Sequence, residues 1–235
     1  MNILAIDSSS LVATVAVVKD DIMTAEYTIN HKKTHSQTLL PMIDEIVRMA
    51  EIDLSEIDAI AISGGPGSFT GLRIGSATAK GLGLVWGKPL IHVPTVDAMA
   101  YNLYGTDKVI CPIMDARRSQ TYTGLYRFED EEFVIEMPQC AISIEELAAK
   151  INEIGKKVIF VGDGIPVFKE YLDEKLTVEH FYAPAHMNRQ RAGAVAVLGQ
   201  KYYEDGKTET AAEHKPDYLR LSQAEREAKE KAANE

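Results

Sequence analysis

Short apolar runs separated by polar turns open the chain and predict three strands. Ile3–Asp7 is an apolar run that ends in an aspartate, and Ser8–Ser10 supplies a polar turn. Ala13–Val18 and Ile22–Ile29 are two further apolar runs, joined by the polar turn Lys19–Asp21. Connections this short favour antiparallel hairpins, so we expect the three strands to lie side by side.

A helix follows these predicted strands. Apolar residues from Leu39 to Ala50 recur at helical spacing, and Thr34 with Gln37 fits a capping box. Pro41 would remove one helical hydrogen bond. We therefore expect either a kink at this proline or a helix that begins near Leu40.

A glycine-rich loop separates the next predicted strand from a second helix. Asp58–Ser63 is predicted as a buried strand, Gly64–Gly71 as the loop, and the helix after it ends near Trp86. Gly87–Pro89 stops that helix, and Pro89–Val93 is predicted as another strand.

The order of elements then repeats, although sequence identity between the two halves is negligible. The repeated elements are the apolar run Val109–Met114 ending in Asp115, the strands Thr121–Phe128 and Phe133–Met137, a helix that Ser143 and Glu146 cap, and the strand Lys157–Val161. This order is βββαβα twice. Chance similarity between two unrelated α/β halves is the alternative interpretation.

The repeat divides the chain into four predicted parts. Residues 1–105 form the first half, and residues 106–190 form the second. Residues 191–221 hold a helix, Ala192–Tyr203, that we expect to pack back on the first half, followed by a connecting segment. Residues 222–235 form a charged tail, which we interpret as a solvated, fraying helix.

Composition narrows the class of protein. The formal net charge is −10, whereas a protein that grips nucleic acid by itself usually has a basic surface. An autonomous RNA binder is therefore not expected. The apolar runs are too short for a membrane span, and the N-terminus lacks the pattern of a signal peptide. The two cysteines are too few for a disulfide framework, so the cytoplasm is the expected compartment.

Two turns and one helix face are candidates for binding. The Asp7–Ser10 turn and the Gly64–Gly71 loop could hold an anion, because small residues let backbone amides approach it. Ordinary tight turns are the alternative for both. Four small residues, spaced four apart, give the second helix one smooth face: Gly71, Gly75, Ala79 and Gly83. That face could pack inside the domain or against a partner helix.

Two other polar pairs are weaker candidates. His31 and His35 have a spacing that suits a metal on a helix, but no third ligand lies nearby in sequence. Ordinary surface histidines are the preferred interpretation. Arg117 and Arg118 occupy the turn that corresponds to Ser8–Ser10 in the second half. Their bulk argues against ordinary ATP binding between the halves.

Four segments resemble the TsaB (YeaZ) family of bacterial proteins, and the resemblance spans nearly the whole chain. The segments are Ile3–Ser9, His35–Ile43, the loop Gly65–Arg73 with the sequence GPGSFTGLR, and Pro216–Arg220. The resemblance implies an actin-like fold, related to hexokinase and ribonuclease H. It also implies a role in making threonylcarbamoyladenosine (t6A) in tRNA, beside a catalytic paralogue, TsaD, and a small ATPase, TsaE.

The chain departs from the TsaD pattern where catalysis would need a metal. TsaD-like proteins carry a His-x-x-x-His pair after the strand that corresponds to Pro89–Val93. Here Thr95 and Met99 stand at those positions, and neither replaces imidazole on a catalytic metal. We therefore expect no catalytic residue, no metal and no cofactor in the isolated protein.

Three functions remain in contention. The preferred one is a non-catalytic scaffold subunit that supports TsaD together with TsaE and reaches tRNA only through the complex. A small-molecule kinase of the same fold and a glycoprotease-like metalloprotease are the alternatives. Arg117 and Arg118 count against the kinase, and the missing metal pair counts against the protease.

The resemblance implies that the two helices of the first half meet their counterparts in TsaD, and that the same surface forms a homodimer when TsaD is absent. The first helix is more apolar than one buried stripe requires. A charge at Ile46 is accordingly expected to weaken association while the fold survives. The candidate partner-binding residues are Leu39, Leu40, Met42, Ile43, Ile46, Val47, Gly71, Gly75, Ala79 and Gly83.

Overall fold

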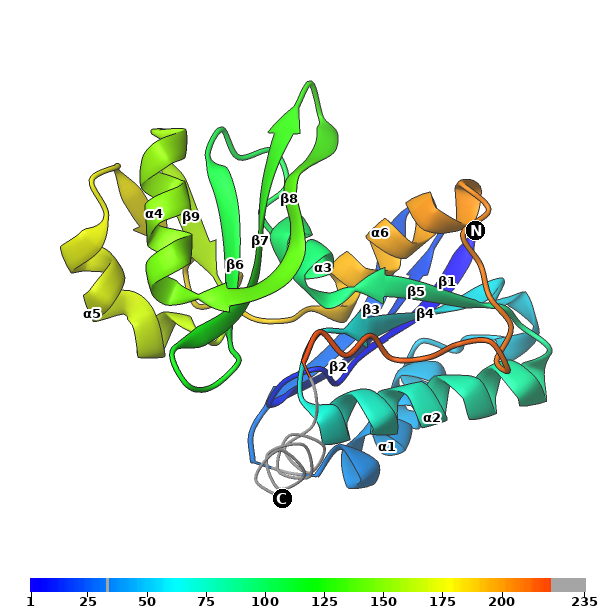
Figure 1. Cartoon of the computed structure of the whole chain (residues 1–235). Coiled ribbons are helices and arrows are strands. Elements are labelled where there is room, and N and C mark those ends of the chain that lie inside the picture. Colours follow the sequence, from blue (N-terminus) through cyan, green and yellow to red (C-terminus); the bar gives the residue numbers. More distant parts are fainter. Residues whose placement is uncertain (33, 221–235) are drawn as a thin grey trace, which may run out of the picture.

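The computed structural model describes residues 1–32 and 34–220, and it has two lobes, each built around its own five-stranded sheet (Figure 1). The first sheet has the order β3-β2-β1-β4-β5. Strands β1, β2 and β3 are antiparallel, while β4 and β5 run parallel to β1. The bounds are β1 Asn2–Asp7, β2 Val12–Lys19, β3 Ile22–Asn30, β4 Ala59–Gly65 and β5 Leu90–Pro94.

Helices cover both faces of the first sheet, which explains why β1 and β2 are apolar at nearly every position. Leu4 and Ile6 of β1 face a core shared with the helices α1 and α2, whereas Ile3 and Ala5 face a core shared with α6. The bounds are α1 His35–Met49, α2 Phe69–Trp86 and α6 Ala192–Glu204; the short 3-10 helix η1, Leu54–Glu56, precedes β4.

The second sheet repeats the topology of the first, with the order β8-β7-β6-β9-β10. Helices α4 and α5 share one core with this sheet, and the short helix α3 packs on its other face, between the lobes (Figure 1). The bounds are β6 Val109–Asp115, β7 Gln120–Glu129, β8 Glu132–Ser143, β9 Val158–Val161, β10 His180–Tyr182, α3 Thr95–Tyr101, α4 Ile144–Ile154 and α5 Ile165–Lys175. The predicted α/β actin-like fold with a repeated βββαβα order is confirmed.

Helix α6 follows the second lobe in sequence but lies on the first sheet. Its residues Val195, Ala196 and Leu198 are buried in one core with β1, β2 and β5. The last part of the chain therefore closes the first lobe. Leu221 and the predicted charged tail, residues 222–235, lie outside the described residues.

Local sequence signals succeeded at one helix start and failed at another. The Ser143 hydroxyl accepts a hydrogen bond from the Glu146 amide at 3.1 Å, as the predicted cap of α4 requires. The capping box at Thr34 is wrong, because Gln37 N–H bonds the backbone carbonyl of Thr34 and the threonine side chain makes no cap bond. Helix α1 begins at His35 and continues through Pro41, so the alternative start near Leu40 is also wrong.

Two elements lie outside the predicted pattern. Helix α3 has only seven residues, all of them buried, so it shows no amphipathic period. Strand β10 has three residues, too few for an alternating pattern. Among the described residues, every helix is too short or too polar to span a lipid bilayer.

Candidate functional site

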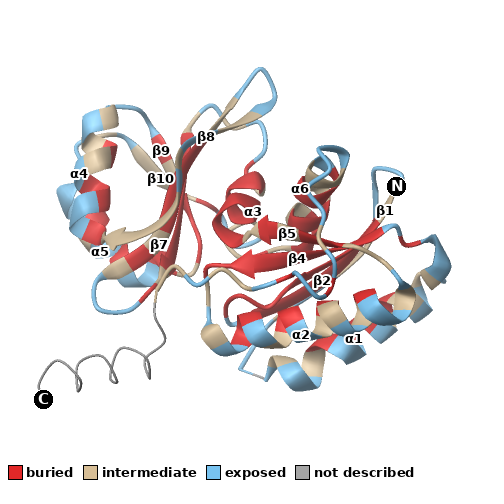
Figure 2. Cartoon of the chain, turned by 45° about the vertical axis from the view of Figure 1, so that its right-hand side comes forward, coloured by how far each residue is buried: buried red, intermediate tan, exposed pale blue. Residues whose placement is uncertain are grey.

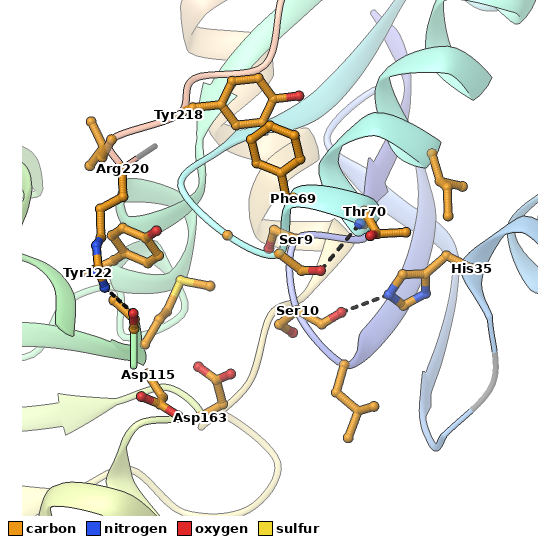
Figure 3. A pocket seen from close by; sticks show the side chains of 18 of the residues that line it. Ser9, Ser10, His35, Phe69, Thr70, Asp115, Tyr122, Asp163, Tyr218 and Arg220 are labelled. Atoms are coloured by element: carbon orange, nitrogen blue, oxygen red, sulfur yellow. Dashed lines mark hydrogen bonds between the residues drawn. The ribbon is translucent and has the colours of Figure 1, made fainter. Parts of the chain in front are cut away.

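A cleft of about 660 Å³ lies between the lobes, where the turn after β1 faces the turn after β6. Figure 3 shows Ser9, Ser10 and Phe69 on the wall of the first lobe and Asp115 and Asp163 on the wall of the second. The C-terminal segment lines the cleft as well, through residues 217–220. In a two-lobed fold this junction is the natural place for a ligand.

The glycine-rich loop is shaped by the β1 turn rather than by an empty anion site. A β-carbon at Gly67 would overlap the Ser9 carbonyl, and one at Gly71 would overlap the Ser8 carbonyl. The Ser68 amide donates to the Ser9 carbonyl at 2.6 Å, and the Gly71 amide donates to the Ser68 hydroxyl at 3.3 Å. Two amides at the start of α2 are therefore already bonded within the chain, which favours the tight-turn interpretation.

The turn of the second lobe repeats one hydrogen bond of the first but not its smooth surface. The Ser9 amide donates to Asp7 Oδ1 at 2.8 Å, and the Arg117 amide donates to Asp115 Oδ1 at the same distance. Arg117, Arg118 and Ser119 then have left-handed backbone conformations, which L-residues adopt at a cost. The turn therefore carries side chains where a nucleotide-binding turn would carry glycines.

The segment Asp217–Arg220, here called the strap, crosses the cleft and joins the lobes. The Asp217 amide donates to the Gly64 carbonyl at 2.7 Å, and its carboxylate accepts from Gln139 of β8 at 3.1 Å. The Tyr218 ring stacks on Phe69 with centroids 4.2 Å apart.

Arg220 completes the strap on the side of the second lobe. Its guanidinium donates to the Ala116 carbonyl (Figure 3). The sequence motif Pro216–Arg220 carried only a family resemblance, whereas the structure gives its residues a place in the cleft.

Negative charge on the second wall also disfavours a phosphate. Burial is the main reason that the pKa of Asp163 is raised to about 6; Asp115 acts in the same direction, while Arg189 and Arg117 act to lower the pKa. At neutral pH the Asp163 carboxylate is mostly ionised and shares the wall with Asp115. Arg117 pairs with Asp115 at 3.2 Å and offsets part of this charge, so the cleft is lined by both acids and arginines.

The positions that would carry a metal pair in TsaD-like proteins are closed by packing. The Thr95 hydroxyl lies 2.7 Å from that of Ser63, and it accepts from the Gly65 amide at 3.2 Å. Met99 is 1% exposed in the core between the lobes. Thr95 and Met99 thus link α3 to the two sheets.

The two histidines predicted as a weak metal-binding candidate lie in different surroundings. His31 is exposed, while the His35 ring lies 2.7 Å from the Ser10 carbonyl through Nε2. A ring held in this way positions the start of α1 beside the β1 turn. One cluster of three potential metal ligands occurs among the described residues, and it includes neither His31 nor His35.

The predicted partner-binding residues of α2 face inward, which is a correction. A β-carbon at Gly75 would overlap the Ser8 hydroxyl, and one at Gly83 would meet Leu90 and the Lys88 carbonyl. The two remaining residues of the smooth face, Gly71 and Ala79, are also buried in the lobe. The smooth face therefore serves packing between α2 and its own sheet.

Most of the predicted residues on α1 also belong to the core. Four of them are at most 4% exposed and are not available to a partner: Leu39, Met42, Ile43 and Ile46. Val47 is partly buried against the same core. Leu40, at 55% exposure, is the exception. The surplus of apolar residues on α1 is therefore absorbed within the lobe, by the sheet and by α2.

The outward faces of α1 and α2 are exposed (Figure 2). Some of the exposed residues nevertheless have large apolar side chains. Met49 on α1 is 68% exposed, and Leu84 and Val85 on α2 are 72% and 81% exposed. Gly81, also exposed on α2, has open space around its missing β-carbon. Sequence reasoning missed these α2 residues, although an exposed glycine inside a helix, which costs about 1 kcal/mol relative to alanine, was a usable signal.

Fold and site together define the class: an actin-like two-lobed protein whose cleft is crossed by its own C-terminal segment. The family profile described as TsaD, tRNA N6-adenosine threonylcarbamoyltransferase, matches residues 23–228. The TsaB proteins of Bacillus subtilis and Escherichia coli are 32% and 29% identical to the chain, over 96% and 94% of it and 96% and 95% of their own lengths. The solved structure of YeaZ from Pseudomonas aeruginosa superposes with a TM-score of 0.80 at 24% identity, covering 93% of this chain and 99% of that one. The chain belongs to the TsaB (YeaZ) family.

Proposed function

We propose that the chain is a non-catalytic subunit in the biosynthesis of threonylcarbamoyladenosine in tRNA. The names of its relatives, tRNA threonylcarbamoyladenosine biosynthesis protein TsaB, support the process. The packed side chains of Thr95 and Met99, and the strap across the cleft, support the absence of catalysis. The net charge of −10 supports contact with tRNA only through the complex.

The partner surface in this proposal is the outward face of α1 and α2, and its occupant is the catalytic paralogue TsaD. The exposed side chains of Leu40, Met49, Leu84 and Val85 carry the proposal, because large apolar side chains left in water favour cover by a partner. Gly81 adds a place where a partner helix could approach closely. The ATPase TsaE would join the assembled pair, in the cytoplasm.

The same face would form a homodimer when TsaD is absent, since the apolar side chains are then left in water. A homodimer of this kind competes with TsaD for one surface. Dilution of the chain should therefore raise its apparent affinity for TsaD.

The test uses substitutions on the outward face that leave the core intact. Leu84→Glu and Gly81→Gln should keep the circular dichroism spectrum and melting temperature close to those of the parent chain, because both sites are exposed. Burying a leucine side chain stabilises an interface by about 1.5–3 kcal/mol, so Leu84→Glu should weaken TsaD binding about tenfold or more in calorimetry. Val167→Glu, at a site on α5 that is 57% exposed, is the matched control and should bind as the parent does.

Two outcomes would refute this docking surface. Folded Leu84→Glu protein that binds TsaD with unchanged affinity would place the interface elsewhere. Equal weakening by Val167→Glu would show a general effect of added charge rather than a local contact.

The kinase alternative is separated by a second measurement. The cleft volume of about 660 Å³ could admit a nucleotide, but the Arg220 contact and the buried acid Asp163 oppose one. Titration of the isolated chain with ATP and magnesium should show no saturable binding. Binding that strengthens in Arg220→Ala would support a nucleotide site closed by the strap, whereas tight binding to the parent chain would favour the kinase.

A further inference from the structure

A cluster of two histidines and a glutamate lies outside the set of residues that line the cleft. The side chains of His92, Glu209 and His214 each offer one potential ligand atom, and these atoms all lie within 4.8 Å of one another. His92 is on β5, whereas Glu209 and His214 belong to the segment that follows α6. No sequence spacing pointed to this cluster, because more than a hundred residues separate His92 from the other two.

The backbone around the cluster is held in place by hydrogen bonds. Glu209 and Leu90 exchange two backbone hydrogen bonds, of 2.8 and 2.9 Å, which fix the segment against the edge of the first sheet. Lys80 of α2 donates to the His214 carbonyl at 3.0 Å. The three side chains therefore start from supported positions rather than from a free loop.

The side chains of the cluster are close together, and His214 is buried. His214 has no exposed side-chain surface; its Nδ1 lies 2.5 Å from Glu209 Oε1, and its Nε2 is buried without a hydrogen-bond partner. The His92 ring lies over Gly64, where a β-carbon would overlap it. The two imidazole centroids are 5.8 Å apart.

A buried ring nitrogen without a partner is costly, and a hydrogen-bonded pair of His214 and Glu209 alone does not relieve it. A metal ion bound to His214 Nε2 would give this buried nitrogen a partner.

We propose that His92, Glu209 and His214 bind one Zn²⁺ ion, which clips the C-terminal segment to strand β5. Two imidazoles and a carboxylate suit zinc rather than magnesium or calcium, which prefer oxygen ligands. Tetrahedral ligands at 2.0–2.2 Å from zinc lie about 3.3 Å apart, which is within the limit of 4.8 Å that holds for the ligand atoms of this cluster. A water molecule would take the fourth position, because Glu209 and His92 are only partly buried.

The position of the clip gives it a consequence. The chain continues from His214 to the Asp217 amide, which bonds Gly64, and on to Tyr218 and Arg220 in the cleft. Zinc would thereby fix the base of the strap without entering the cleft. The proposed role is structural.

The test starts with the full-length chain, stripped of metal with EDTA and returned to metal-free buffer. Equilibrium dialysis against ZnCl2 should give one zinc per chain. At a free zinc concentration about 100-fold above Kd, the melting temperature should rise by about 5–10 °C. Co²⁺ in place of zinc should give the intense visible absorption bands of a four-coordinate site.

Variants locate the site. Glu209→Gln and His214→Gln should each weaken zinc binding at least tenfold, and Glu209 is partly exposed, so its variant should fold even if the other does not. His180→Gln is the matched control, because His180 also pairs with an acid, Asp173, at 3.0 Å but belongs to no three-ligand cluster among the described residues. It should bind zinc as the parent does.

Three results would overturn the proposal. The first is a parent chain whose melting temperature does not respond to zinc. The second is zinc binding that survives both Glu209→Gln and His214→Gln. The third is binding that is lost in His180→Gln, which would place the metal on the second lobe.

Discussion

Removal of one hydroxyl group from the junction between the lobes should measurably destabilise the protein. Asp97 of α3 is 4% exposed, and its Oδ1 accepts a hydrogen bond of 2.6 Å from the Tyr126 hydroxyl of β7. On the other side, Tyr202 of α6 donates to Oδ2 at the longer distance of 3.4 Å. One carboxyl group therefore links α3, the second sheet and the last helix of the first lobe.

The substitution Tyr126→Phe removes the shorter bond and keeps the ring, which stacks on Phe133 with centroids 5.3 Å apart. Packing is retained, so the cost is that of the lost hydrogen bond. Hydrogen bonds to charged groups contribute about 1.5–3 kcal/mol. In a chain of this size each kcal/mol shifts the melting temperature by about 2–4 °C, so we expect a decrease of about 3–12 °C.

The loss should depend on pH in a defined direction. Burial raises the pKa of Asp97 above 3.8, while the bonds from Tyr126 and Tyr202 lower it. A carboxyl group with a raised folded-state pKa contributes stability below pH 3.8 and loses it as the pH rises through the folded value. Deleting the Tyr126 bond raises that pKa further, so the destabilisation should be larger at pH 8 than at pH 4.5.

Urea denaturation at the two pH values, followed by circular dichroism, provides the assay. Tyr27→Phe is the control, because Tyr27 lies on the edge strand β3 and is 41% exposed. The role assigned to this bond would be refuted if the melting temperature of Tyr126→Phe lay within about 1 °C of the parent value. That limit is about a tenth of the largest expected decrease. A larger loss at the acidic pH would refute the sign.

Three further predictions concern the core and the cleft. Gly75→Ala should destabilise the chain by about 1–3 kcal/mol, because the new methyl group meets Ser8. Gly81→Ala on the same helix should instead stabilise the chain by up to about 1 kcal/mol. Equal effects of the two substitutions in urea denaturation would contradict the inward orientation of Gly75. Ile46→Glu should unfold the chain or lower the free energy of unfolding by at least about 3 kcal/mol, because Ile46 is 4% exposed. A melting temperature equal to that of the parent would contradict this and support the expectation from the sequence that the fold survives. Asp163 has a pKa raised to about 6, so the protein should lose up to about 3 kcal/mol of stability as the pH rises from 4 to 6. Asp163→Asn should abolish this dependence of the free energy of unfolding on pH. An unchanged dependence in the variant would assign it to other groups.

Sequence patterns alone predicted the order of the main strands and helices and the class of fold. Apolar runs that end in Asp7 and Asp115 marked equivalent first strands, because a buried strand and its polar turn are encoded within a dozen neighbouring residues. Through the family resemblance, Thr95 and Met99 led to the prediction that the chain has no catalytic metal pair. These are local features, and a linear pattern carries them.

Orientation was decided only in three dimensions. The small-residue face of α2 was compatible with either a partner or the sheet, since periodicity defines a face but not its direction; the Ser8 turn against Gly71 and Gly75 settles it inward. The apolar surplus of α1 misled for the same reason, because a sheet and a neighbouring helix can bury more than one stripe.

Contacts between residues far apart in the chain could not be predicted from the sequence either. Arg220 reaches the Ala116 carbonyl, and His92 lies beside Glu209 and His214, although each pairing joins residues about a hundred positions apart. Such contacts depend on how α6 returns to the first sheet and where the segment after it then runs. Sequence patterns report the neighbours of a residue along the chain, whereas a site requires neighbours in space, and only the packing of the two lobes supplies them.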